Sequence, residues 1–169
     1  MPKINIKVDI KDLEQLVKDY PEASRMATIS RLTEATKFLE RVVKFKTPRG
    51  VGPTPLRNTI FSKVEYGTPV QYGTSIRGLV GTPAKYGEAV EFGTKPHMPP
   101  RREIIFWVAR KLGLSGLELR EAVRNIRWHI YQHGTEGAHM FEKGFNENKA
   151  FITKMLEKIP EDIVKSLKK

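Results

Sequence analysis

The sequence lacks cysteine and long apolar runs, and both absences exclude classes of protein. With no cysteine among its 169 residues, the chain forms no disulfide, no thiolate metal site and no thiol nucleophile. No segment approaches the roughly 20 consecutive apolar residues of a membrane-spanning helix. The stretch Met1–Asp12 lacks the apolar run of a signal peptide. We therefore expect a chain that is neither secreted nor embedded in a membrane.

Motifs of the common enzyme classes are also missing. No glycine-rich phosphate loop follows an expected strand, no serine lies in a nucleophile elbow, and the carboxylates show no paired spacing. His129 and His133 have the four-residue spacing that lets two imidazoles share a zinc ion, but Ile130 stands where the metalloprotease motif has glutamate. We expect no catalytic residue, no cofactor and no metal, and we interpret these histidines as surface or interface residues.

Acidic residues are too few to balance the basic ones, which gives a formal charge of +11. The excess is uneven, because residues 95–128 hold eight Lys and Arg against three Asp and Glu. Such a patch attracts phosphate groups or an acidic protein surface, although a solvated helix face has the same composition.

The N-terminal half alternates between strand and helix patterns. Lys3–Asp9 places its apolar residues at every second position, which predicts a half-buried strand. Asp12 then caps a short helix that Pro21 ends. From Glu22 to about Phe45, apolar residues recur every three or four positions and predict one long helix. Its expected stripe is Met26, Ile29, Leu32, Ala35, Leu39 and Val42 or Val43.

A loop and two strands follow the long helix. Three prolines and two glycines make Thr47–Pro55 a loop. Ile60–Tyr66 and Val70–Thr82 read as short strands separated by glycines, which favours an antiparallel meander. The inward-facing candidates are Val64, Tyr66, Ile76 and Val80.

Residues 84–100 predict a short amphipathic helix that ends at Gly93 in a left-handed cap and runs into a proline-rich turn. On a purely architectural interpretation, Tyr86, Val90 and Phe92 belong to the core. Everything beyond this stretch has helical patterning.

Three further helices are expected. Arg101–Leu112 forms a helix that Gly113 closes, and Ser115 with Glu118 has the form of a capping box that starts a second helix, ending near His133. A last helix begins at about Asn146, breaks at Pro160 and resumes. Residues 93–98 and 134–140 share a Gly-Thr followed by a His-Met, which we interpret as two similar helix exits.

The two helices around Gly113 resemble a helix-turn-helix. Ala109, Gly113 and Leu119 have the expected small, turn and aliphatic positions, and Arg120, Arg124 and Arg127 lie at helical spacing on the second helix. Any tightly turned helical hairpin needs the same positions, so residues 108–127 leave a DNA-binding regulator as one alternative.

A longer run of features resembles the phage tail-completion or neck proteins, which include head–tail joining and minor tail proteins. The family pattern has a proline and a short turn before Leu-Arg and a small polar residue, and later a tyrosine shortly before Glu-Phe-Gly-Thr. This chain matches it with Leu56-Arg57-Asn58 and with Tyr86 before Glu91–Thr94, within a likeness that covers about residues 1–110. The turn Arg49–Pro55 is longer than the family pattern.

The resemblance implies a structural virion protein assembled in the host cytoplasm. It predicts an α+β fold, with a small antiparallel sheet packed by a long N-terminal helix and an additional helical hairpin and terminal helix. Residues 1–100 form the expected core, and 101–169 a helical extension packed on the same domain. Copies of the chain are expected to form a ring, expected to be hexameric, with no catalytic residues. The expected partners are other copies, a connector or head-completion protein, a tail terminator or tail tube protein, and genomic DNA in the lumen.

The resemblance and the charge pattern together nominate three sets of site residues. The expected contacts to DNA or an acidic partner are Arg101, Arg102, Arg110, Lys111, Arg120, Arg124 and Arg127. The expected subunit or ring contact loop contains Arg49, Val51, Pro53, Pro55 and Arg57. The expected architectural residues are Tyr86, Val90, Glu91, Phe92, Gly93 and Thr94.

Overall fold

The computed structural model describes residues 3–6, 14–50, 54–70 and 73–168 and has an α+β fold. The chain divides into two compact units. The sheet–helix unit comprises Pro2–Lys46, Ile60–Thr82 and Met140–Lys169, and the hairpin unit comprises Thr47–Thr59 and Pro83–His139. This division differs from the expected one at residue 100, because the C-terminal helices pack against the long N-terminal helix.

The sheet of the sheet–helix unit has three antiparallel strands, β1 (Lys3–Ile6), β2 (Phe61–Val70) and β3 (Gly73–Gly81). The strand order is β1-β3-β2, with Ile4 opposite Val80 and Ser62 opposite the same residue on the other side. The expected antiparallel pairing of the two strands after the loop is confirmed, and β1 pairs with the other edge of β3, so that β3 is the central strand. The expected break at Gly67 is absent from the described residues, because β2 continues through it with a register shift between Tyr66 and Pro69. The Val8 and Ile10 positions of the first predicted strand and the Asp12 cap lie outside the described residues.

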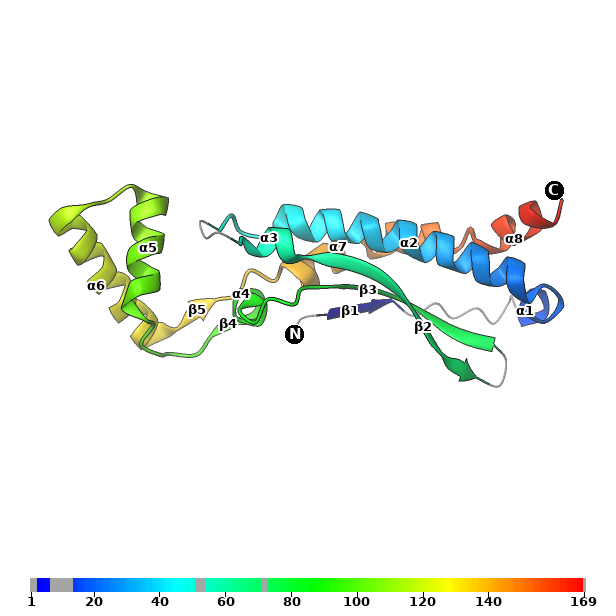
Figure 1. Ribbon diagram of the computed structural model, residues 1–169, viewed down its shortest axis with the longest axis horizontal. Helices are drawn as coiled ribbons and strands as arrows, with labels where there is room; N and C mark the ends of the chain where they lie inside the picture. The colour runs from blue at the N-terminus through cyan, green and yellow to red at the C-terminus, as the bar shows by residue number, and fades with distance from the viewer. Residues whose placement is uncertain (1–2, 7–13, 51–53, 71–72, 169) are drawn as a thin grey trace. The chain divides into compact units, whose positions relative to one another are not determined.

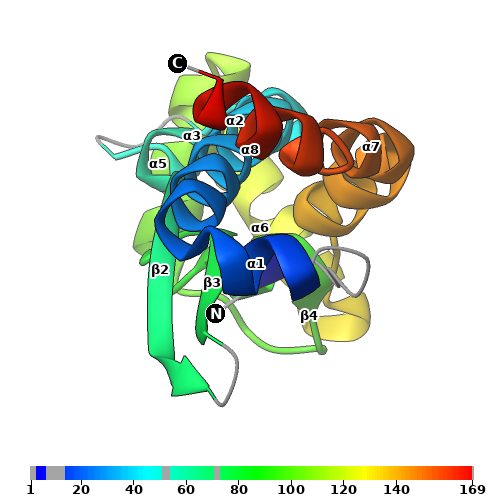
Figure 2. The same ribbon diagram turned by 90° about the vertical axis from the view of Figure 1, so that its right-hand side faces the viewer.

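One long helix, α2 (Pro21–Lys46), covers the sheet, and the short α1 (Glu14–Asp19) precedes it. Figures 1 and 2 show α2 along β2 and β3, with α7 beside it. Gly78 of β3 permits this close approach, because a Cβ there would lie 2.5 Å from Cγ2 of Thr36. The predicted helix is confirmed, and Leu32, Ala35 and Leu39 of its stripe are fully buried. Met26 is 64% exposed, so its place in the stripe was wrong.

Two C-terminal helices, α7 (Met140–Leu156) and α8 (Ile159–Leu167), complete this unit. The first begins six residues before the predicted Asn146, because Met140 and Phe141 are buried and Gly144 approaches Val43 of α2. Pro160 lies in the first turn of α8, where its missing N–H costs nothing.

Polar contacts join α2 to its neighbours at two points. The Arg31 guanidinium donates two hydrogen bonds to the Asp162 carboxylate of α8, one of them 3.0 Å long. This hydrogen bonding holds the pKa of Asp162 below its ordinary value, against the opposing effect of burial. On the other side, Ser62 of β2 donates to Glu40 of α2. Burial raises the pKa of Glu40, but hydrogen bonds from Lys44 and Ser62 outweigh it and leave that pKa lowered.

The hairpin unit contains short elements and two longer helices. Its elements are α3 (Leu56–Thr59), α4 (Gly87–Phe92), β4 (Gly93–Thr94), α5 (Arg101–Leu112), α6 (Gly116–His133) and β5 (Thr135–Glu136). The predicted ends of α5 are confirmed, and Gly113 closes it in the left-handed conformation, with φ 68° and ψ 15°. Ser115 is the N-cap of α6 but makes no side-chain capping hydrogen bond, so the expected capping box does not form.

The repeated Gly-Thr forms a two-stranded ribbon. Both copies follow a helix, as expected, and pair antiparallel, with Gly93 opposite Glu136 and Thr94 opposite Thr135. The Oγ1 atoms of the two threonines are 3.0 Å apart. A Cβ on Gly93 would overlap the carbonyl oxygen of Thr135, and one on Gly134 would overlap that of Thr94. The two glycines therefore let the two backbones pass each other.

The buried and exposed residues of α4 and its N-cap are the reverse of those expected. Tyr86 and Phe92 are 47% and 60% exposed, Val90 is half-buried, and Glu91 is fully buried. The peptide N–H of His139 donates to the carbonyl of Glu91 and that of Ala138 to Val90, so the chain after β5 covers this face. Gly93 has φ 77° and ψ −171°, which is not the expected left-handed helical cap. The positive φ at Gly93 serves the ribbon instead.

Candidate partner-binding groove

Helices α5 and α6 form a hairpin held together by a few apolar side chains. Val108 of α5 and Val123 of α6 are almost fully buried, and Leu119 and Ile126 are half-buried. The turn between the helices is Gly113–Ser115, and only glycine adopts the positive φ of Gly113 without strain. The hairpin therefore has a narrow interior and a large surface.

The turn that precedes α5 is fastened to the C-terminal half of α6. The peptide N–H of His97 donates to the carbonyl of Ile130 over 3.3 Å, and Nε of Arg127 donates to the carbonyl of Pro99 over 3.0 Å. Pro99 is buried, whereas its neighbours Met98 and Pro100 are exposed. These bonds fix Met98 and the start of α5 beside α6.

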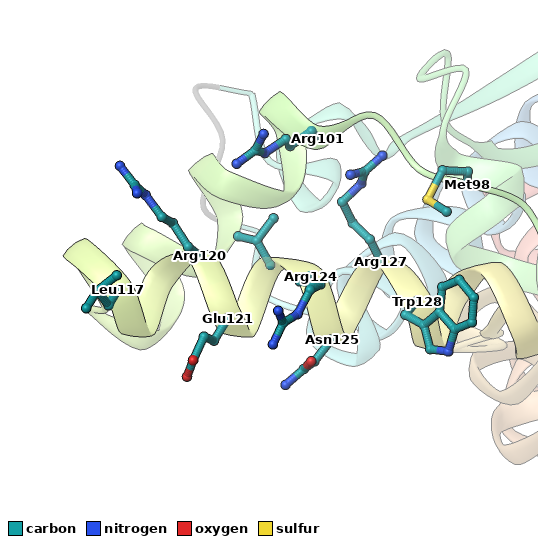
Figure 3. Close-up of a pocket in the computed structure, with 10 residues that line it drawn as sticks. Met98, Arg101, Leu117, Arg120, Glu121, Arg124, Asn125, Arg127 and Trp128 are labelled. Carbon is teal, nitrogen blue, oxygen red and sulfur yellow. The ribbon is translucent and has the colours of Figure 1, made fainter.

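An open groove of about 690 Å³ lies along α6 in this unit. Its lining residues are Met98, Arg101, Leu117, Arg120, Glu121, Val123, Arg124, Asn125, Arg127 and Trp128. Figure 3 shows Leu117 at one end of the row and Trp128, with Met98 nearby, at the other, while the arginines lie between them. The groove thus combines apolar ends with a basic middle.

The charges of the groove are unbalanced. Four guanidinium groups line it against the single carboxylate of Glu121. Among the residues that the structure describes, no carboxylate forms an ion pair with Arg101, Arg120 or Arg124. Like charges at this density repel one another, and an anionic occupant relieves that repulsion.

The predicted basic residues divide into two groups. Arg101, Arg120, Arg124 and Arg127 line the groove. Arg102, Arg110 and Lys111 are exposed on α5 but are not among its lining residues. The guanidinium carbon of Arg110 lies 4.8 Å from the ring centroid of Phe106, a cation–π contact.

The predicted contact loop is described only in part. Arg49 and Arg57 are exposed and Pro55 is half-buried, whereas Val51 and Pro53 lie outside the described residues. The Tyr86 hydroxyl donates a 2.7 Å hydrogen bond to the carbonyl of Thr54. Tyr86 therefore contacts this loop from the surface and not from the predicted core position.

The sequence interpretation missed the apolar ends of the groove. Leu117 is 76% exposed and Trp128 is 55% exposed. The 3.6-residue period carries the signal, because Leu117, Arg124 and Trp128 lie seven and eleven positions apart on one face of α6. A large apolar residue that is exposed among basic residues does not pack in a core, so its position suggests a binding surface.

The histidine pair is not part of a larger group of potential metal ligands in the described residues. The rings of His129 and His133 lie 4.8 Å apart, but no group of three or more potential metal ligands occurs within residues 3–6, 14–50, 54–70 and 73–168. In the same part of the chain, none of the helices combines the length and apolarity that crossing a bilayer requires.

Fold and groove together define an α+β protein whose helical hairpin presents a basic, partly apolar groove. Comparison with protein-family models, curated proteins and solved structures found no match for this chain.

Proposed function

We propose that the chain is a structural subunit of a tailed-bacteriophage neck. In this proposal, copies of the chain form a ring, expected to be hexameric, that joins the head connector to the tail and completes the tail. The neighbours are a connector or head-completion protein on one side and a tail terminator or tail tube protein on the other. The chain supplies position and charge, and no reaction is assigned to it.

The observation that carries the proposal is the large apolar surface of the hairpin unit. Six large apolar side chains of α5 and α6 are 40–76% exposed. They are Phe106, Trp107, Leu112, Leu117, Trp128 and Tyr131. Large exposed apolar patches mark protein–protein contacts, and we assign these side chains to such a contact.

The residues that carry the family resemblance also support a structural role. Tyr86 binds the loop at Thr54, Glu91 is buried, and Gly93 with Thr94 forms the ribbon. The Tyr86 and Thr94 side chains and the backbones of Glu91 and Gly93 thus contact other parts of the chain. The excess of arginine on the hairpin fits a surface that contacts either an acidic partner or DNA, without reading the DNA sequence.

The first test measures assembly. Purified protein is examined by mass photometry over a concentration series and by negative-stain electron microscopy, alone and mixed with isolated connector complexes. We expect ring-shaped oligomers, and Leu112→Glu should reduce their fraction while Val164→Glu on α8 serves as the control. A chain that stays monomeric in every mixture contradicts the proposal.

A helix-turn-helix regulator is the second candidate. The observation in its favour is the short turn at Gly113, after which α6 exposes Arg120 and Arg124. A regulator binds one duplex site tightly, with each wrong base pair costing roughly 1–3 kcal/mol. Selection from random duplexes at fixed salt separates the candidates: one sequence enriched by orders of magnitude favours the regulator, whereas weak uniform binding favours the neck subunit.

A further inference from the structure

We infer that the groove along α6 is a docking site for an acidic amphipathic helix of a partner protein. The inference deepens the proposed function, because it rests on the assignment of these arginines to a partner contact and names the chemistry of that partner. It depends only on the hairpin unit.

The dimensions of the groove fit a short helix. Leu117 and Trp128 are eleven residues apart on α6, which corresponds to about 16 Å or three helical turns. A partner helix of about twelve residues spans the same distance. Apolar side chains in its first and last turns would meet the two ends of the groove.

The charges favour an occupant with carboxylates in its middle. Arg120 and Arg124 lie between the apolar ends, and Arg101 faces the same groove from α5. A guanidinium group presents its N–H donors in a plane that matches a carboxylate with two parallel hydrogen bonds. Glu and Asp at helical spacing on the partner would therefore pair with this row.

Arg127 shows that part of the groove is already ordered. Its Nε donates to Pro99, and the guanidinium group carries five N–H donors in all. A side chain that is held in place before binding loses less conformational entropy on docking. The same bond fixes the turn that carries Met98.

A protein partner explains the apolar ends better than duplex DNA does. Phosphate groups neutralise arginines, but the charged backbone of a duplex offers little apolar surface to Leu117, Met98 or Trp128. In protein interfaces, by contrast, aromatic and arginine side chains together form the residues that dominate the binding energy. DNA remains an outcome that the experiment below distinguishes.

The test selects ligands from a display library of random 16-residue peptides. The purified protein is the bait, and the double variant Arg120→Glu/Arg124→Glu is used for counter-selection. We expect a consensus with at least two Asp or Glu between two large apolar residues. Enriched peptides that lack acidic residues, or no enrichment above an unrelated bait, would overturn the inference.

Binding of the consensus peptide is then measured by fluorescence anisotropy. We expect Arg120→Glu/Arg124→Glu to weaken binding by more than about tenfold, and Leu117→Ala and Trp128→Ala by about tenfold each, the size expected of central contacts. Lys149→Glu/Lys154→Glu on α7 makes the same change in net charge and should bind like the unaltered protein. Circular dichroism of each variant shows whether it has folded.

A 20-base-pair duplex and a 20-nucleotide single strand serve as competing probes. The groove is a DNA contact, and the inference is wrong, if DNA binds more tightly than the peptide and Leu117→Ala and Trp128→Ala leave DNA binding unchanged. Mass photometry of the same samples reports assembly separately. A failure of peptide docking with rings intact is thereby distinguished from a failure of the ring proposal.

Discussion

The two units of the chain use their helices in opposite ways. Helix α2 of the sheet–helix unit buries eight residues, whereas α5 and α6 of the hairpin unit bury one each. The first unit obtains its stability from internal packing, because small residues such as Gly78 and Gly144 bring elements close together. Large apolar side chains are exposed on both units, for example Phe45 in the first and Leu117 in the second. The difference therefore lies in the interior: the sheet–helix unit has a core of its own, whereas the α5–α6 hairpin has a small one.

The largest expected difference between the two units comes from truncating one leucine in each of them. Leu39→Ala removes a fully buried side chain of α2 and should lower the free energy of unfolding by about 2–5 kcal/mol. Leu117→Ala on α6 should change it by less than about 0.5 kcal/mol. Urea unfolding followed by circular dichroism measures both. Equal effects would show that α6 is packed as tightly as α2.

The ribbon glycines give the next largest effect. Gly134→Ala places a methyl group against the carbonyl of Thr94 and should destabilise the hairpin unit by about 3 kcal/mol. Gly113→Ala is the matched control, because its φ is also positive but its Cβ would meet nothing within 4 Å, and it should cost about 1 kcal/mol.

Tryptophan fluorescence reads out this pair of variants. Both tryptophans of the chain, Trp107 and Trp128, belong to the hairpin unit. Their emission therefore follows the unfolding of that unit. Similar midpoints for Gly134→Ala and Gly113→Ala would contradict the role assigned to the ribbon.

The bond between α2 and α8 predicts a dependence on pH. Because the pKa of Asp162 is lowered in the folded protein, its contribution is complete above the unfolded pKa and is lost as pH falls below about 4. Asp162→Asn should cost about 1.5–3 kcal/mol at pH 7 and less at pH 3, where part of the contribution has been lost. Glu161→Gln, in an exposed pair with Lys165, should change stability by less than about 1 kcal/mol. Thermal unfolding at both pH values checks this.

The smallest expected effect sharpens the description of the hairpin unit. Tyr86→Phe removes only the hydroxyl that donates to Thr54, which should cost about 0.5–1 kcal/mol because the group is exposed. Hydrogen exchange should instead show faster opening near Thr54. Unchanged exchange there would mean that the bond does not hold the loop.

Helical periodicity predicted more of the fold than strand patterning did. The limits of α2 and α5 follow from a long apolar period ended by proline or glycine. The strand order was not predictable, because pairing between β1 and β3 joins segments about 70 residues apart and carries no local signal. The turn at residue 67 was misplaced for a related reason, since β2 accommodates Gly67 through a register shift.

Only part of the candidate site could be predicted from the sequence. The arginines were nominated because charged residues at helical spacing mark the exposed face of a helix. The burial of Glu91 and the exposure of Phe92 had no such signal, because the carbonyls and peptide N–H groups of distant residues decide which side of α4 is covered. The apolar ends of the groove were missed because Leu117 and Trp128 are two apolar residues three turns apart, a weak pattern beside a row of arginines.

The order of elements along the chain has a consequence for synthesis on the ribosome. Helix α2 packs against α7, which is translated about 100 residues later, a delay of roughly 5–20 s at ordinary rates of elongation. During that interval Val43 lacks Gly144, its neighbour on α7, and α2 has the β2–β3 hairpin as a partner before α7. The nascent chain therefore exposes the apolar face of α2 early, and a chaperone that binds apolar helices should be most needed before residue 140 emerges.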